Sequence, residues 1–242
     1  MVMRETSSGL QVLLMAAAVA SVGCAPAKVT TAASPAIEQY RVQTVVVMPF
    51  KRLETPQILD SPSPEFSVPG GAKRSDISMM VPPPSSEKLD LRTTTVPDFV
   101  PEQIAGIMYD QLRKRTDLRV LSPDDAKAAI RSLGKGTTSP EQAAREVAGR
   151  LGVDAALLGR VLVYRERVGS KWGANPAVVG FEVKLVGTDG ETLWSANYYE
   201  KQRPLIEDVT GFFQRGGVFV TAGELARYGA EHIVQKFPFG RP

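Results

Sequence analysis

The sequence predicts an α/β (α+β) fold: a two-layer sandwich whose mixed sheet contains an antiparallel three-strand meander at 154–202, packed by helices. Three apolar-rich runs, at 155–167, 177–186 and 192–202, supply the strands, because they hold Val, Leu, Phe, Tyr and Trp between turn residues. Asp189-Gly190 separates the second run from the third and is typical of tight hairpin turns. A meander of this size is marginal alone in water, so helices elsewhere in the chain must cover its apolar face.

Apolar and polar residues alternate along the second run. The apolar positions of one parity are Val179, Phe181, Val183 and Leu185. Glu182 and Lys184 occupy the opposite parity, and this period of two predicts one buried and one solvated face. We therefore expect Phe181 in the core, together with Trp194 from the third run.

Residues 1–23 have the pattern of a lipoprotein signal peptide. The mainly apolar run 10–22 has the length of a secretory h-region and is too short to span a bilayer. It ends at Ser21-Val22-Gly23-Cys24, which resembles the bacterial lipobox, where the cysteine is lipid-modified and the signal peptide is cut off just before it. An ordinary signal peptide that happens to contain a cysteine is the alternative. If Cys24, the single cysteine, is acylated, no thiol remains for a disulfide or for catalysis.

Beyond the signal peptide, the sequence predicts one domain at 42–238. Residues 24–41 are predicted to be a flexible tether, because small and polar residues dominate from 25 to 39. The near-continuous apolar run 42–50 indicates a strand covered on both faces. Residues 51–96 hold seven prolines and no sustained periodicity, so we expect a long proline-rich loop, either functional or disordered.

Helix signals follow this loop, and several begin with an N-cap residue before a proline or an acid. The predicted helices are 101–115, 122–133, 139–151, a short packing helix around 205–213 and a final helix from 221 to before Pro238, with a short strand at 118–121.

Composition argues against several functions. The 29 basic and 26 acidic residues give a net charge of +3, too small an excess to indicate nucleic-acid binding. The single histidine, His232, excludes a multi-histidine metal site, and its place on the apolar side of a helix favours packing over catalysis. No cofactor motif or catalytic set emerges, so we expect no enzyme. The alternative is an envelope hydrolase that uses a Ser/Lys or a carboxylate site.

Aromatic residues near glycines are the candidate partner-binding residues. Trp172 lies at the tip of a predicted hairpin, where it either contacts a partner or folds back onto the sheet edge. Phe212 and Phe213 precede Gly216-Gly217 and either meet lipid or a neighbouring subunit, or pack in the core.

Several short strings resemble one family of envelope proteins. They are Met48-Pro49-Phe50, the helix at 104–112, Val120-Leu121-Ser122, the Gly152-Val153-Asp154 entry to Leu157-Leu158-Gly159, and the string from Lys184 to Ser195. Over roughly 44–237, apart from the proline-rich loop, the chain is similar to CsgG-type envelope lipoproteins, a superfamily that includes activators of penicillin-binding proteins. It departs from the family string at Gly187, near the usual Asp, and at Asp189, in place of the usual Thr.

This resemblance implies a TolB N-terminal-like α/β fold and a binding or assembly role, as an accessory of secretion, polysaccharide export or peptidoglycan synthesis. It also implies a lipid anchor at Cys24, an envelope protein as partner, and a possible homo-oligomer. Because Ala25 rather than Asp follows the cysteine, the periplasmic side of the outer membrane is favoured. No nucleic acid and no cofactor is expected.

Replacement of Cys24 with Ser should abolish metabolic labelling with palmitate and leave the precursor unprocessed, because the lipid acceptor is lost. Labelling that persists undiminished in the variant would contradict this prediction.

Overall fold

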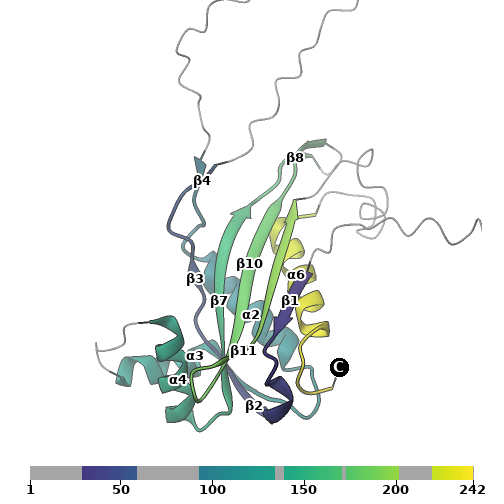
Figure 1. Cartoon of the computed structure of the whole chain (residues 1–242). Coiled ribbons are helices and arrows are strands. Elements are labelled where there is room, and N and C mark those ends of the chain that lie inside the picture. Colours follow the sequence, from purple (N-terminus) through teal and green to yellow (C-terminus); the bar gives the residue numbers. More distant parts are fainter. Residues whose placement is uncertain (1–28, 59–92, 134–138, 171–172, 202–219, 242) are drawn as a thin grey trace, which may run out of the picture.

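A computed structural model describes residues 29–58, 93–133, 139–170, 173–201 and 220–241. It confirms the predicted mixed α/β architecture (Figure 1). Its seven-stranded sheet has the order β1-β11-β10-β7-β2-β6, with β3 also paired to β7, and it does not close on itself.

The described residues form strands of one main sheet, two small strand pairs and four α-helices. The strands of the main sheet are β1 (Val29–Ala33), β2 (Thr44–Val47), β3 (Lys51–Arg52), β6 (Arg119–Leu121), β7 (Ala155–Arg165), β10 (Val178–Gly187) and β11 (Thr192–Lys201). Two small antiparallel pairs are β4 (Gln57–Ile58) with β5 (Thr93–Thr94), and β8 (Val168–Ser170) with β9 (Gly173–Asn175). The helices of the described residues are α2 (Val100–Leu112), α3 (Pro123–Ser132), α4 (Pro140–Leu151) and α6 (Ala222–Gln235), with a 3-10 turn η2 (Ile37–Gln39).

The predicted meander is present, because β7, β10 and β11 pair antiparallel in chain order. Phe181 of β10 lies opposite Tyr198 of β11. The turn between these strands closes through the amide of Gly190, which donates to the carbonyl of Gly187 at 3.0 Å. Gly190 has φ +91°, a conformation that glycine adopts without strain.

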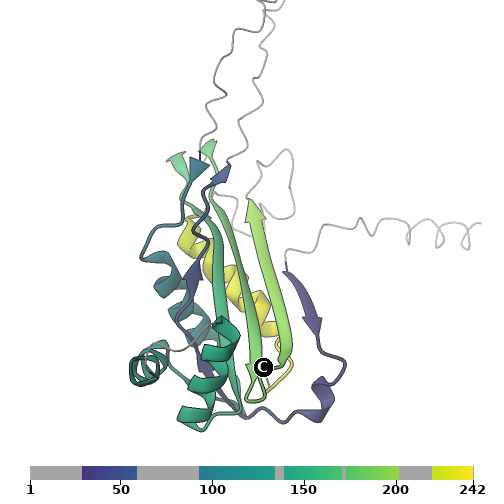
Figure 2. The same cartoon turned by 60° about the vertical axis from the view of Figure 1, so that its left-hand side comes forward.

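Helices α2 and α6 pack together along one face of the sheet (Figure 2). The larger core cluster lies between these layers and includes the fully buried Phe181 and the nearly buried Trp194, as the alternation predicts. Strand β2 is buried on both faces: Val45 and Val47 belong to this cluster, whereas Val46 belongs to a second cluster under α3 and α4.

Helices α3 and α4 cover only one end of the other face, beside β2 (Figure 1). Helix α4 begins at its N-cap Ser139 and ends at Gly152, whose φ of +62° is left-handed. The next amide, that of Val153, donates back to the carbonyl of Ala148 at 3.0 Å. This closing geometry turns the chain directly into β7.

The structure corrects the predicted tether and loop. Residues 24–41 were expected to be flexible, yet Val29–Ala33 forms β1 and Ile37–Gln39 forms η2. The pairing of β1 with β11 supplies order that the composition lacks. The ends of the predicted loop 51–96 are likewise ordered, as β3, β4 and β5.

The domain also extends past its predicted end at 238, because a buried arginine binds the chain terminus. The guanidinium of Arg115 donates to four backbone carbonyls, those of Val234, Phe237, Phe239 and Gly240, at 2.8 to 3.2 Å. Burial lowers the pKa of Arg115. The residue therefore holds the segment after α6 against the end of α2.

Replacement of Phe181 with Ala should lower the free energy of unfolding by about 3–5 kcal/mol, because a fully buried aromatic side chain leaves a cavity. Denaturant unfolding monitored by circular dichroism measures this loss. Tyr199→Ala is the matched control, since Tyr199 is exposed on the neighbouring strand. A loss below about 1 kcal/mol for Phe181→Ala would mean that the core does not depend on this face.

Asp154 links the start of β7 to the start of β2. Its Oδ2 accepts hydrogen bonds from the amides of Gln43 and Thr44 and from the hydroxyl of Thr44, at 2.8 to 2.9 Å. Partial burial raises the pKa of Asp154, but these hydrogen bonds lower it by more, so the net pKa is below its usual value.

A carboxyl whose folded-state pKa is depressed stabilises the fold above its unfolded pKa of about 3.9, and this contribution is lost as pH falls through the folded pKa. Asp154→Asn should therefore cost about 1 kcal/mol at pH 7 and less near pH 2, since the site is partly solvated. Urea unfolding at both pH values tests this, with Asp110→Asn as an exposed control. An equal cost at both pH values would contradict a role for the charge.

Candidate functional site

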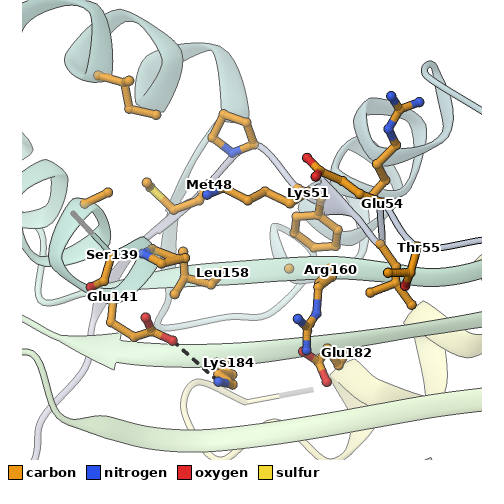
Figure 3. A pocket seen from close by; sticks show the side chains of 18 of the residues that line it. Met48, Lys51, Glu54, Thr55, Ser139, Glu141, Leu158, Arg160, Glu182 and Lys184 are labelled. Carbon is orange, nitrogen blue, oxygen red and sulfur yellow. Dashed lines mark hydrogen bonds and ion pairs between the residues drawn. The ribbon is translucent and has the colours of Figure 1, made fainter. Parts of the chain in front are cut away.

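A trough of about 890 Å³ opens on the sheet face opposite α2 and α6 (Figure 3). Strands β7 and β10 form its floor, the α3–α4 pair forms one wall, and the segment that leaves β2 forms the other. The trough exists because α3 and α4 end before they cover the whole face. Its volume is in the range of small-ligand and peptide clefts.

Two ion pairs lie on the floor of the trough. The Arg160 guanidinium contacts a carboxylate oxygen of Glu182 at 2.7 Å, and Lys184 Nζ lies 3.5 Å from Glu141 Oε1 (Figure 3). All four side chains are partly exposed. The alternation that buries Phe181 aims Glu182 and Lys184 into the trough, where their charges are already balanced by neighbours.

Apolar side chains contribute to one wall, while the segment after β2 and the start of α4 add further polar residues: Lys51, Arg52, Glu54, Thr55 and Ser139. Ile130 of α3 is 39% exposed and stands beside Leu133 on the wall. Phe50, by contrast, belongs to the larger core cluster, and its ring lies over Gly159 of β7, where an added Cβ would be 2.3 Å from the ring, so glycine is required at this position. The trough is therefore amphipathic, with an apolar wall beside a floor of paired charges.

A serine, a lysine and a carboxylate share this trough, as the alternative hydrolase would require. The Ser139 hydroxyl, however, accepts from the Gln142 amide at 3.0 Å as the N-cap of α4. Lys184 is engaged with Glu141, and no hydrogen bond joins Ser139 to Lys184 among those found for the described residues. Lys184 is thus not in the contact with Ser139 that would activate a serine nucleophile.

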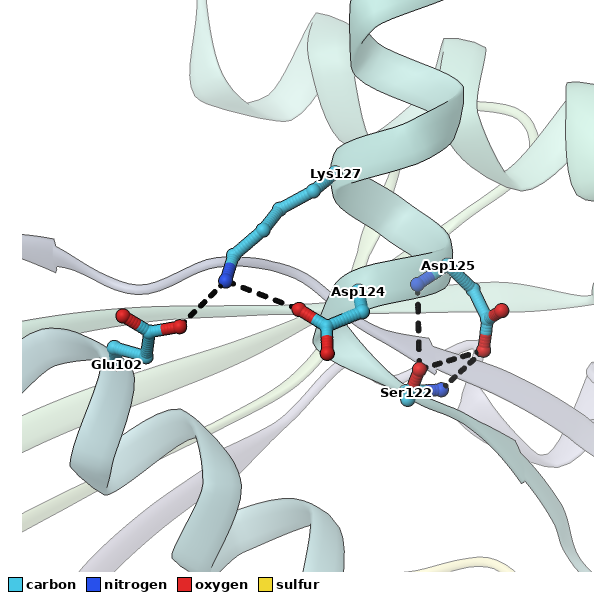
Figure 4. A network of polar contacts seen from close by, with 5 residues as sticks. All are labelled: Glu102, Ser122, Asp124, Asp125 and Lys127. Atoms are coloured by element: carbon cyan, nitrogen blue, oxygen red, sulfur yellow. Dashed lines mark hydrogen bonds and ion pairs between the residues drawn. The ribbon is translucent and has the colours of Figure 1, made fainter.

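A smaller crevice of about 390 Å³ lies where α2 and α3 begin. Lys127 bridges Glu102 at 2.7 Å and Asp124 at 3.1 Å, and Asp125 forms a capping box with Ser122 (Figure 4). The hydrogen bonds from Ser122 lower the pKa of Asp125. These first-turn acids therefore stabilise the helix and its neighbour, as the sequence predicts.

The predicted lipidation and partner-binding residues, Cys24, Trp172, Phe212 and Phe213, lie outside the described residues. Strands β8 and β9 form the predicted hairpin on either side of position 172. His232 packs on the Tyr228 ring, with centroids 3.9 Å apart, and its Nδ1 lies 2.8 Å from the Tyr228 carbonyl oxygen. Packing of this imidazole agrees with the sequence analysis.

Sequence reasoning missed the trough. The one signal in the sequence is that Glu182 and Lys184 alternate with apolar residues along the second meander strand. The same alternation is expected for a strand face that is simply exposed to solvent. The wall formed by residues 48–55 depends on the path of the chain after β2. Pro49 indicates that this strand ends, but it does not indicate the path that follows.

Within the described ranges, no group of three or more His, Cys, Asp and Glu side chains is placed to hold a metal ion. Nor is any helix of those ranges long and apolar enough to cross a membrane.

No family model matches the chain, and no curated protein matches it either. Solved structures do. The PelC dodecamer from Paraburkholderia phytofirmans is 15% identical, with 85% of this chain and 93% of that chain covered and a TM-score of 0.44. The LpoB C-terminal domain from Salmonella enterica is 11% identical (69% and 94% covered, TM-score 0.33). Lipoprotein GNA1162 from Neisseria meningitidis is 12% identical (71% and 98% covered, TM-score 0.35). At these values the function has to follow from the chain's own residues.

Proposed function

We propose that this chain is a lipid-anchored binding or assembly protein of the bacterial envelope, on the periplasmic side of the outer membrane, of the CsgG-like superfamily. Its role is to dock to another envelope component. The amphipathic trough on the open sheet face carries this proposal. An enzyme needs polar groups that converge on one reacting atom, whereas four charged groups of this trough, Arg160, Glu182, Lys184 and Glu141, form two ion pairs.

The apolar wall gives a partner something to bury. Ile130 stands 39% exposed beside Leu133, and Leu158 contributes to the floor below them. An amphipathic helix or strand would cover these side chains with its apolar face and leave its polar face toward Arg160 and Glu182. Burial of apolar residues supplies affinity, and the ion pairs restrict which charges a partner can bring.

Anchoring confines where that partner can be. Four residues, 25–28, separate Cys24 from the start of β1 at Val29, so a lipid on Cys24 is at most about 17 Å of chain away from the sheet. Val29 pairs with Tyr198, near the end of β11. The end of the sheet toward β8 therefore stays near the membrane.

Trp172, Phe212 and Phe213 form a second candidate docking surface, proposed from their sequence context alone. The nearby Val168 of β8 is 62% exposed, which agrees with an apolar contact at this end. Contact with lipid, with another protein or with a second copy in a homo-oligomer would each use such residues.

Site-specific photo-crosslinking of the lipidated protein in its own cells tests the trough. A photoreactive residue at Ile130 should crosslink to a defined envelope partner, whereas one at the adjacent Arg131, exposed and outside the trough, should not. Ile130→Asp should reduce recovery of this partner at least tenfold and change stability by less than about 1 kcal/mol, because the side chain is already exposed. A photoreactive residue at Trp172 reports on the second surface.

Equal crosslinking from Ile130 and Arg131 would remove the trough from this proposal. Crosslinks from Trp172 alone would move the docking surface to the hairpin. If Ser139→Ala abolishes function while the crosslink at Ile130 persists, the envelope hydrolase becomes the better account.

A further inference from the structure

Strand β1 is an edge strand that buries almost nothing. Its sequence is Val-Thr-Thr-Ala-Ala, and Val29 is its one buried side chain, at 4% exposed. The four residues after it are exposed. Such a strand is held by its backbone ladder rather than by side-chain packing, which is the character of segments that open locally before the rest of a domain.

Few interactions beyond this ladder hold β1. It pairs with β11 over five residues, from Val29 opposite Tyr198 to Ala33 opposite Trp194. Lys236, the C-cap residue after α6, donates to the Val29 carbonyl at 2.9 Å.

The chain that follows β1 is fixed more firmly, and this sets where a hinge would be. Ile37 and Tyr40 pack against the core. The Tyr40 hydroxyl donates to Asp189 Oδ2 at 2.5 Å, which raises the pKa of Tyr40 and lowers that of Asp189. Between β1 and Ile37 lie Ser34-Pro35-Ala36, so residues 29–36 can leave the sheet with the loss of one buried side chain, Val29, and of the hydrogen bond from the Ser34 amide to the Leu193 carbonyl.

We infer that β1 is a releasable strand that sets how far the domain stands from the membrane. This inference rests on the lipid anchor of the proposed function. With β1 docked, at most about 17 Å of chain joins Cys24 to the sheet. With β1 released, the chain from Cys24 to Ile37 is up to about 44 Å long, so the free tether lengthens by up to about 27 Å and its attachment moves from the β8 end of the sheet to Ile37.

The local sequence of this strand favours a tether, whereas the structure pairs it with β11. This conflict is expected if the docked and released states of β1 have similar free energies. The composition of 25–39 predicts a tether, and yet β1 is paired. Segments whose local preference conflicts with the fold have low stability. Release also uncovers the β11 edge, whose free N–H and C=O groups would then accept an extended segment of a partner brought within reach.

Hydrogen exchange of the soluble Cys24→Ser chain tests release without the membrane. We expect the β1 amides to exchange at least 100-fold faster than those of the central strand β10. The pair Ala32→Cys and Ser195→Cys, at directly opposed positions, should form a disulfide that slows this exchange at least tenfold, and reduction should restore it. Exchange of β1 within threefold of β10 would overturn the inference.

The distance to the membrane is measured on the lipidated chain in vesicles, by energy transfer from a fluorescent residue at the exposed Val168, at the β8 end of the sheet, to labelled lipid headgroups. The parent should show two distances between the fluorescent residue and the headgroups. The oxidised disulfide variant should show only the shorter distance, of docked β1, and Val29→Asp should show only the longer distance, of released β1. Thr30→Asp, exposed in the same strand, should behave as the parent. A single distance for the parent that oxidation leaves unchanged would overturn the inference. If the chain fails to bind vesicles while β1 exchanges fast, the anchor of the proposed function fails and the release of β1 stands.

Discussion

The packing of the meander against α2 and α6 is the constraint on which the other features depend. Tyr198 shows how close this packing is, because its ring lies against Gly229 of α6, where an added Cβ would be 2.3 Å away. On its other side the same ring meets Phe181 at a centroid separation of 5.5 Å. Because helix and sheet are this close, the register of the meander strands determines which side chains face the helices. A shift of one residue would move each side chain of a strand to the opposite face.

The trough lies on the sheet face that α2 and α6 do not cover. Helices α2 and α6 pack on one sheet face, so the proposed binding surface is placed on the other. There α3 and α4 cover the end near Val46 and stop. The remaining floor carries charged side chains that the meander's alternation places outward, and the chain leaving β2 through Phe50 closes its side. No additional loop is needed to form the trough, because α3 and α4 cover only one end of this sheet face and leave the rest of it open.

Much of the architecture could be predicted from the sequence because its signals are local. Period-two alternation identified β10, and Ser122 and Ser139 with the prolines after them marked the starts of α3 and α4. Strand β1 could not be recognised in this way, because its order comes from a partner more than 160 residues later and its own composition resembles a linker. The role of Arg115 has no local signal either, because its partners lie about 120 residues further on.

The candidate site was harder to predict than the fold for the same reason. Glu182 and Lys184 are recognisable as polar positions, but their partners Arg160 and Glu141 come from two other elements. Whether a polar position is bathed in solvent or lines a trough depends on where α3 and α4 end, and no local pattern encodes that. The residues at 24, 172, 212 and 213 remain predictions from sequence alone.

The direction of β1 has a mechanical consequence if the proposed lipid anchor at Cys24 is present. The strand enters the sheet at the end near Lys201 and runs antiparallel to β11. A pull on the N-terminal side therefore acts along the strand axis and loads the backbone hydrogen bonds of the ladder together, in shear, rather than peeling them one at a time. Arg115 meanwhile ties the opposite terminus to the body of the domain. With the proposed lipid on Cys24, tension would thus fall first on the β1–β11 ladder, whose hydrogen bonds share the load, while the helices and the trough lie outside the loaded path.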